Sequence, residues 1–166
     1  MLQLQTSCAE TNKAEPAVLV VFGVPLDEQP CLEGSSIPLI IESCVKEVEL
    51  RGMDSEGIYR IAGVKSSVEK LGAAFEHHGK SKAKLDLSFE PDINAITGCL
   101  KAFLRQLPEP VIPYDDYNDV IEAAGLAGYN EEKLAQLIGS LPKVNYDTLV
   151  YLVKHLWYLF GGDTPF

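Results

Sequence analysis

The chain has 166 residues, of which 46% are hydrophobic, and its formal net charge is −10. That length and apolar content are typical of a single globular domain with a buried core. The acidic balance argues against a nucleic-acid binder, which usually presents a basic face, and against attachment to an anionic membrane surface.

Residues 1–20 are predicted to be a disordered or loosely ordered tail, because the chain up to about residue 15 shows no sustained hydrophobic periodicity. The next segment reads as extended or looped, with Pro25, Pro30 and Gly34 as breaks. No stretch is long enough to span a bilayer, and the short apolar run AVLVVFGVPL makes a poor signal peptide. The sequence therefore predicts a cytoplasmic protein without direct membrane insertion.

The first two predicted helices are IPLIIESCVKEVELRG and SSVEKLGAAFEHHG. The first has Pro38 in its first turn, Gly52 at its end and an apolar stripe of Ile41, Cys44, Val45 and Val48. The second opens with Ser66-x-x-Glu69, which predicts a capping box, and Gly79 closes it. Its stripe consists of Val68, Leu71 and Phe75.

The third predicted helix, PDINAITGCLKAFLRQLP, has the clearest pattern. Asp92 is placed to cap its N-terminus, and the prolines of LPEP end it. One face is apolar along its whole length and consists of Ile93, Ile96, Leu100, Phe103, Leu104 and Leu107.

Three more helices are predicted in YDDYNDVIEAAG, NEEKLAQLIGSLP and NYDTLVYLVKHLWYLF. The first is expected to bury Tyr117, Val120, Ile121 and Ala124. The second starts with Asn130 and two glutamates, which are favourable beside the partial positive charge of a helix N-terminus. The last is apolar nearly all round, which predicts a place in the centre of the bundle. Because strand signals are nearly absent, the predicted fold is all-α.

Neither a metal site nor a cofactor site is predicted. The four cysteines, Cys8, Cys31, Cys44 and Cys99, include no C-x-x-C pair, and the histidines share no zinc-like spacing with them. Cys44 and Cys99 fall in helical apolar patterns and are expected to be reduced core thiols. The spacing from Gly57 to Ser66 departs from the phosphate-binding loop, and no Ser/His/Asp grouping stands out.

Three cations could serve a partner. Arg60 stands alone in DSEGIYRIAG, between Gly57 and Gly63, on what reads as a tightly held loop. Lys101 and Arg105 are four residues apart, so they project from one side of the third helix. Each of these residues is either a charge presented to another molecule or part of an ordinary solvated surface, and spacing alone favours the solvated surface.

Three stretches in this order, FGVPL, IPLIIESCVKEVELRGMDSEGIYRIAG and DINAITGCLKAFLRQLPEPVI, resemble the Rho GTPase-activating (RhoGAP) domain. The stretches PDINAITGCLK, PVIPYDDYNDVIEAA and NYDTLVYLVKHL look most like its chimaerin and breakpoint-cluster-region branch. The resemblance covers residues 22 to about 160 and implies that residues 21–166 form a RhoGAP-like helical bundle. It implies as partner a Rho-family small GTPase, of the Rho or Rac type, in its GTP-bound form.

The resemblance also implies roles for particular residues. Arg60 matches the catalytic arginine finger of the family motif, and Lys101 and Arg105 match the cations that support the finger loop and the GTPase contact surface. The remaining matched positions, expected at or near the same interface, are Gly57, Tyr59, Gly63, Pro108 and Pro110. The protein is then not an enzyme itself but an activator that lends a catalytic group to its partner.

Two departures from the family pattern are visible. Ala62 stands where the family often has serine, with little expected effect. Family members also continue beyond the positions of His155 and Leu156 into a segment whose asparagine engages the GTPase, so the domain is expected to be incomplete at its C-terminal end. The expected consequences are an exposed apolar patch on the last helix, lower stability and reduced activity. The alternative function is therefore a GTPase-binding module with weak or no activation, and a third is a helical interaction domain unrelated to GTPases.

Overall fold

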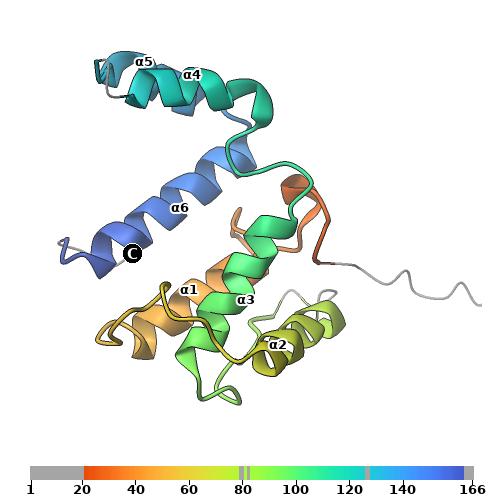
Figure 1. Ribbon diagram of the computed structural model, residues 1–166. Helices are drawn as coiled ribbons and strands as arrows, with labels where there is room; N and C mark the ends of the chain where they lie inside the picture. The colour runs from red at the N-terminus through yellow and green to blue at the C-terminus, as the bar shows by residue number, and fades with distance from the viewer. Residues whose placement is uncertain (1–20, 79–80, 82, 126–127, 163–166) are drawn as a thin grey trace, which may run out of the picture.

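The computed structural model describes residues 21–78, 81, 83–125 and 128–162, so the predicted tail, residues 1–20, lies outside the described chain. Within these ranges the chain forms helices and no β-strand, which confirms the all-α prediction (Figure 1). In chain order the elements are the 3-10 helix η1 (Leu26–Glu28) and the α-helices α1 (Leu39–Arg51), α2 (Lys65–His78), α3 (Ile93–Gln106), α4 (Tyr114–Ala124), α5 (Glu131–Ser140) and α6 (Lys143–Leu159).

The main core forms where α3 packs against both α1 and α2 (Figure 1). The predicted apolar stripes of these three helices meet there, because each helix carries apolar residues at helical spacing on one side. Its most deeply buried side chains include Ile40, Ile41, Cys44, Val45, Val48, Leu71, Phe75, Ile96, Cys99, Leu100 and Phe103. The predicted faces of α1, α2 and α3 are therefore confirmed in outline.

The segment before η1 is tied to α2. The backbone N–H groups of Val21 and Phe22 donate to the two carboxylate oxygens of Glu76, at 2.8 and 3.0 Å. The Gln29 side-chain amide donates to the Val21 carbonyl at 2.8 Å, and the Phe22 ring meets Phe103 edge to face with centroids 6.0 Å apart. Residues 21–29 are therefore an integral part of the domain.

The helix ends follow the sequence signals in most cases. Pro38 and Gly52 flank α1, and the Asn130 side chain caps α5 by accepting from the Lys133 N–H at 2.9 Å. The predicted capping box of α2 is wrong. The Val64 carbonyl already accepts the N–H groups of Ser67 and Val68, so α2 begins at Lys65 and Ser66 lies inside the first turn.

The Asp92 cap carries a stability prediction. Its carboxylate accepts a hydrogen bond from the Asn94 N–H at 2.9 Å, satisfying a donor that the helix itself leaves free. Asp92→Ala is expected to lower the free energy of unfolding by about 1 kcal/mol, measured by urea denaturation. Asp92→Asn keeps the acceptor and should retain most of the stability. Equal losses in both variants would show that the cap is not the cause.

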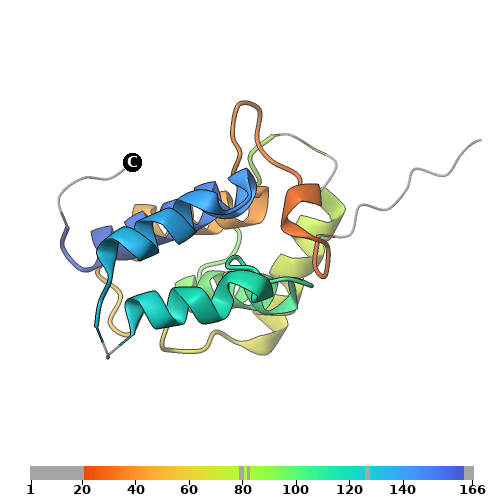
Figure 2. The same cartoon turned by 90° about the horizontal axis from the view of Figure 1, so that it is seen from above.

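Helices α4 and α5 pack on each other and form a pair set apart from the α1–α3 core (Figure 1). Figure 2 looks down on this pair, with the rest of the domain behind it. The predicted face of α4 is wrong in part. Val120 is buried as expected, but Tyr117 and Ile121 are exposed and Ala123 is buried instead of Ala124. The physical reason is that α4 packs mainly against one helix, α5. The strip of buried residues on α4 is therefore narrower than its strip of apolar residues.

The prediction that α6 occupies the centre of the bundle is also wrong. Its buried residues are the polar Asn145, Thr148 and His155, whereas Trp157 is 66% and Val153 55% exposed. The helix packs against the core through partly buried residues, namely Val144, Tyr151, Leu152 and Leu159. The expected exposed apolar patch on α6 is thus confirmed, and its effect on stability stays a prediction.

Candidate functional site

The connection between α1 and α2, residues 52–64, is anchored at its start by Arg51. The Arg51 guanidinium donates to the carbonyls of Glu90 and Pro91 at 2.5 and 2.9 Å and to the Glu47 carboxylate at 2.6 Å. These bonds join the end of α1 to the segment that leads into α3. We call residues 54–63, the DSEGIYRIAG stretch, the finger loop.

Two glycines of the finger loop are required for different reasons. Gly57 has φ +72°, a left-handed conformation that glycine adopts at little cost. Gly63 approaches the start of α3 so closely that a Cβ atom would lie 2.4 Å from both the Cα and the N of Ala95. The left-handed angle at Gly57 and the close approach of Gly63 to α3 both agree with the tightly held loop that the sequence predicts.

Tyr59 is the one non-glycine residue in the described chain with a left-handed backbone, at φ 64°. For a bulky side chain this conformation is disfavoured and persists only when the surroundings hold it. One such anchor is visible at its carbonyl, which accepts a hydrogen bond from Lys101 Nζ at 2.7 Å. The structure therefore brings Lys101 of α3 to the finger loop, one residue before Arg60.

A second anchor holds the Tyr59 side chain. Its hydroxyl lies 2.7 Å from His155 Nε2, and His155 Nδ1 lies 2.8 Å from Glu49 Oε1. The two rings meet edge to face with centroids 5.7 Å apart. His155 is 1% exposed, so this contact is an internal one that joins α1, the finger loop and α6. The sequence had excluded the histidines as zinc ligands, and it identified neither His155 nor Glu49 as part of this site.

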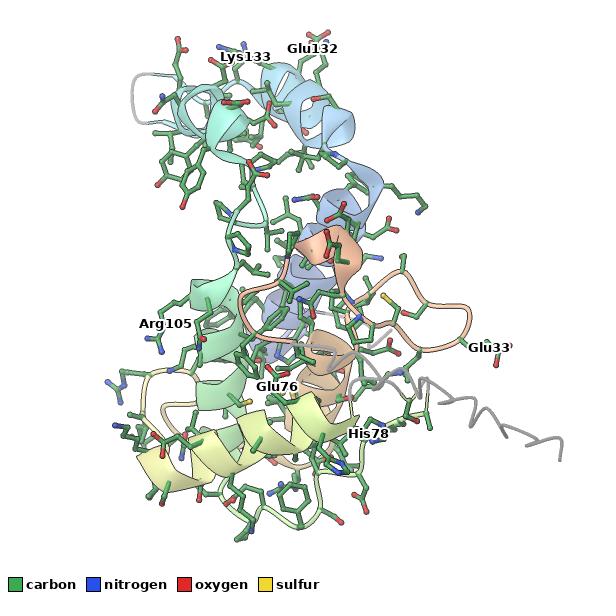
Figure 3. All side chains as sticks on the ribbon, turned by 90° about the vertical axis from the view of Figure 1, so that its right-hand side faces the viewer. Glu33, Glu76, His78, Arg105, Glu132 and Lys133 are labelled. Carbon is green, nitrogen blue, oxygen red and sulfur yellow. The ribbon has the colours of Figure 1, made fainter. Side chains whose placement is uncertain are left out.

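Arg60 itself is exposed, as is Arg105 one turn beyond Lys101. Neither guanidinium has a hydrogen bond or ion pair with any residue that the structure describes. Figure 3 shows Arg105 extending from α3 away from the body of the protein. Both side chains thus keep their donors available for a molecule outside the chain.

Pro108 and Pro110 are less directly part of this site. They follow the end of α3, whereas Gly63 contacts its beginning at Ala95. Pro108 instead lines a hollow of about 350 Å³ with residues of η1, α4 and α6. The structure therefore brings Gly57, Tyr59, Arg60, Gly63 and Lys101 together, places Arg105 on the next turn, and sets the two prolines at the far end of the helix.

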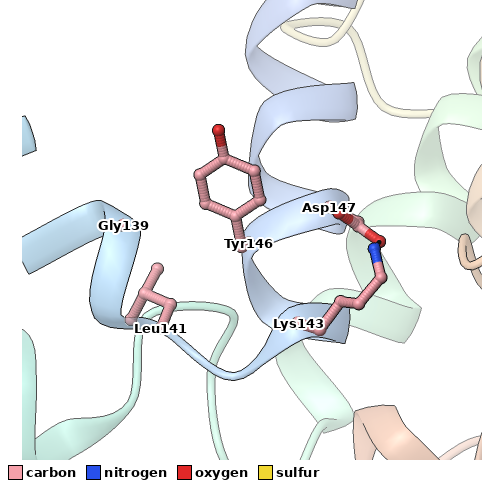
Figure 4. A pocket seen from close by; sticks show the side chains of 5 residues that line it. All are labelled: Gly139, Leu141, Lys143, Tyr146 and Asp147. Atoms are coloured by element: carbon pink, nitrogen blue, oxygen red, sulfur yellow. Dashed lines mark hydrogen bonds and ion pairs between the residues drawn. The ribbon is translucent and has the colours of Figure 1, made fainter.

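A pocket at the junction of α5 and α6 offers no competing chemistry (Figure 4). It is lined by Gly139, Leu141, Lys143, Tyr146 and Asp147, and its charged pair joins Lys143 Nζ to Asp147 Oδ2 at 2.6 Å. Hydrogen bonds from Lys143 and then Ser36 lower the pKa of the Asp147 carboxyl. Such a carboxylate is a poor proton acceptor, so the pocket does not favour acid–base catalysis.

Neither a cluster of metal-ligating side chains nor a membrane-spanning helix is found among the described residues. No three His, Cys, Asp or Glu side chains there gather around a point that could hold a metal ion. Cys44 and Cys99 are buried free thiols, as predicted, and their mutual contact together with burial raises the pKa of Cys44. Among these same residues, no helix combines the length and the apolar character needed to cross a bilayer.

Comparisons with known proteins relate the chain to one family. A sequence profile of the RhoGAP domain matches residues 38–159. Mouse beta-chimaerin is 41% identical over 121 residues, which are 72% of this chain and 36% of that protein. Mouse Rho GTPase-activating protein 23 is 41% identical over 150 residues, 89% of this chain and 10% of that protein. Rat breakpoint cluster region protein is 38% identical over 138 residues, 82% of this chain and 11% of that protein. The chain thus corresponds to a part of each of these longer relatives.

Solved structures show the same fold. The crystal structure of human Rho GTPase activating protein 15 superposes with a TM-score of 0.68 at 33% identity, covering 84% of this chain and 66% of that one. The BH domain of Graf, the GTPase regulator associated with focal adhesion kinase, gives 0.60 at 35% identity, covering 72% and 64%. Sequence and fold therefore agree, and the chain belongs to the RhoGAP domain family.

Proposed function

We propose that this chain accelerates GTP hydrolysis by a Rho-family small GTPase, with Arg60 entering the partner's nucleotide site. The observation that carries the proposal is the state of Arg60: it is exposed, without an internal partner, on a loop held through Gly57, Gly63 and Lys101. The names of the relatives support the same activity, since mouse Rho GTPase-activating protein 23 is 41% identical to this chain.

The chemistry explains why one arginine suffices. Charge develops on the phosphate oxygens in the transition state of GTP hydrolysis, and an arginine supplied in trans neutralises it with an effect of roughly 10³–10⁵ on the rate. The planar guanidinium can bridge two oxygens at once and stays charged at every physiological pH. A loop that is already held in place loses little conformational entropy when it docks. Under this proposal the chain is an activator, and the GTPase remains the enzyme.

The remaining parts of the proposal concern the partner and its setting. We place Arg105 on the surface that contacts the GTPase, because its guanidinium projects outward one turn from Lys101 (Figure 3). Residues 21–166 act together as the RhoGAP domain, with the binding of Val21 and Phe22 to Glu76 supporting the N-terminal limit. A GTP-bound GTPase of the Rho or Rac type and a cytoplasmic location complete the proposal.

A single-turnover assay tests the activity. Rho and Rac proteins loaded with GTP are mixed with an excess of this chain, and phosphate release is compared with the intrinsic rate. Acceleration of at least one GTPase by roughly 10³ or more is expected. Tight binding to the GTP-loaded form without acceleration would favour the binding-module alternative. Absence of both binding and acceleration with every Rho-family member would contradict the proposal.

A further inference from the structure

The buried face of α6 is polar where it meets the finger loop. His155 is 1% exposed, and both of its ring nitrogens have partners, the Tyr59 hydroxyl at 2.7 Å and the Glu49 carboxylate at 2.8 Å. Burying an imidazole in this way is costly unless its polar atoms are satisfied, so the two contacts belong together. They join residues that are 96 and 106 positions apart in the sequence.

The direction of the protons follows from the Glu49 carboxylate, which accepts hydrogen bonds and does not donate them. Burial, together with the nearby Cys44 and Glu49 side chains, raises the pKa of Tyr59, so its hydroxyl keeps its proton. An arrangement that satisfies all three groups has the hydroxyl donating to His155 Nε2 and the imidazole Nδ1–H donating to Glu49 Oε1. The carboxylate thereby selects the tautomer that accepts from Tyr59.

The contact between Tyr59 and His155 affects Arg60 through the backbone of Tyr59. Tyr59 holds a left-handed φ of 64°, and a return to the ordinary negative range would rotate the peptide that leads into Arg60. Lys101 holds the carbonyl end of Tyr59, and His155 holds the side-chain end. Neither anchor alone fixes both the peptide plane and the ring.

We infer that Glu49 and His155 act through Tyr59 as positioning residues that aim the Arg60 guanidinium. This inference deepens the proposed function and rests on it. Neither His155 nor Glu49 is required to contact the GTPase, because both act from inside the domain. Their effect should therefore appear in the rate of hydrolysis within the complex rather than in the affinity of the complex.

Tyr59→Phe is the first test, since it removes the hydroxyl and keeps the ring. With saturating activator, the single-turnover rate is expected to fall about tenfold, because a misplaced catalytic group loses transition-state contact. The dissociation constant for a GTPase loaded with a non-hydrolysable GTP analogue should stay within about twofold. Tyr146→Phe, which removes an exposed phenol from α6, the helix of His155, is the control and should change neither quantity.

His155→Leu and Glu49→Gln provide independent variants. Both should give the rate defect of Tyr59→Phe, and the double variant Tyr59→Phe/His155→Leu should be no slower than the worse single variant. In an Arg60→Ala background Tyr59→Phe should have no further effect, because its role passes through Arg60. Amide hydrogen exchange in residues 54–63 should be faster in each variant, and this measurement requires no GTPase. If His155→Leu fails to fold, Glu49→Gln still tests the contact.

The outcomes separate the inference from the function on which it rests. If Arg60→Ala abolishes activation while Tyr59→Phe and Glu49→Gln leave the saturated rate and the amide exchange unchanged, the positioning role is wrong and the proposed function stands. An equal loss of affinity and rate in Tyr59→Phe would also overturn it, since that pattern indicates a contact residue. If the unmodified chain accelerates no GTPase, both fail.

Discussion

Arg60→Ala is expected to reduce the saturated single-turnover rate of GTP hydrolysis by roughly 10³–10⁵, down to the intrinsic rate of the GTPase. This corresponds to about 4–7 kcal/mol of lost transition-state stabilisation. The stability of the chain should hardly change, because Arg60 is exposed and makes no hydrogen bond or ion pair with the residues that the structure describes. Binding to the GTP-loaded partner should survive, because the charge that Arg60 neutralises is fully developed only in the transition state.

Arg60→Lys is the matched control for that experiment. It keeps the positive charge but replaces the planar fork by a compact ammonium group, so it should recover little of the lost rate. Recovery to near the unmodified rate would mean that charge alone matters and that the geometry of the guanidinium does not. An Arg60→Ala variant with unchanged activation would remove Arg60 from the mechanism altogether.

Lys101→Met should lower the same rate by about 100-fold, the size of effect that a misplacement of about 1 Å produces in a catalytic group. Methionine has a similar length but cannot donate to the Tyr59 carbonyl, so the charged hydrogen bond at 2.7 Å is lost. The left-handed conformation of Tyr59 then loses its backbone anchor. Faster amide exchange in residues 54–63 should accompany the loss of rate.

Arg105→Met gives the comparison, because Arg105 projects from the same helix four residues later and has no anchor in the finger loop. We expect it to weaken binding to the GTPase while leaving the amide exchange of the finger loop unchanged. If Lys101→Met and Arg105→Met gave the same profile of binding, rate and exchange, Lys101 would be a contact residue and not a support of the loop.

Much of the helical core could be predicted from the sequence because its signals are local. Apolar spacing located α1, α2 and α3, and the capping residues Asp92 and Asn130 marked helix starts that the structure confirms. The α2 capping box failed for a local reason as well. Val64 accepts the first helical N–H groups, which moves the helix start ahead of Ser66.

The placement of α6 could not be predicted in the same way. Hydrophobicity indicates which side chains favour burial. The elements that pack against a helix decide which of those side chains become buried. Trp157 and Val153 remain exposed while Thr148 and His155 turn inward, because the inward side is the one that meets α1 and the finger loop. A lone histidine in an otherwise apolar helix was the available signal, since such a residue needs hydrogen-bond partners when buried.

The candidate site likewise has a part that could be predicted from the sequence and a part that could not. Arg60 and its two glycines form a short motif, so they could be identified from the sequence and from its resemblance to the family. The link from Glu49 through His155 to Tyr59 spans 106 residues from α1 to α6 and has no local pattern. Only the packing of the two helices brings its members together.

The attachment of residues 21–29 to α2 has a practical consequence. Where the chain enters the domain, its backbone is held by Glu76 of α2. A fluorophore, affinity handle or surface tether joined ahead of Val21 would therefore start from a fixed point on the domain.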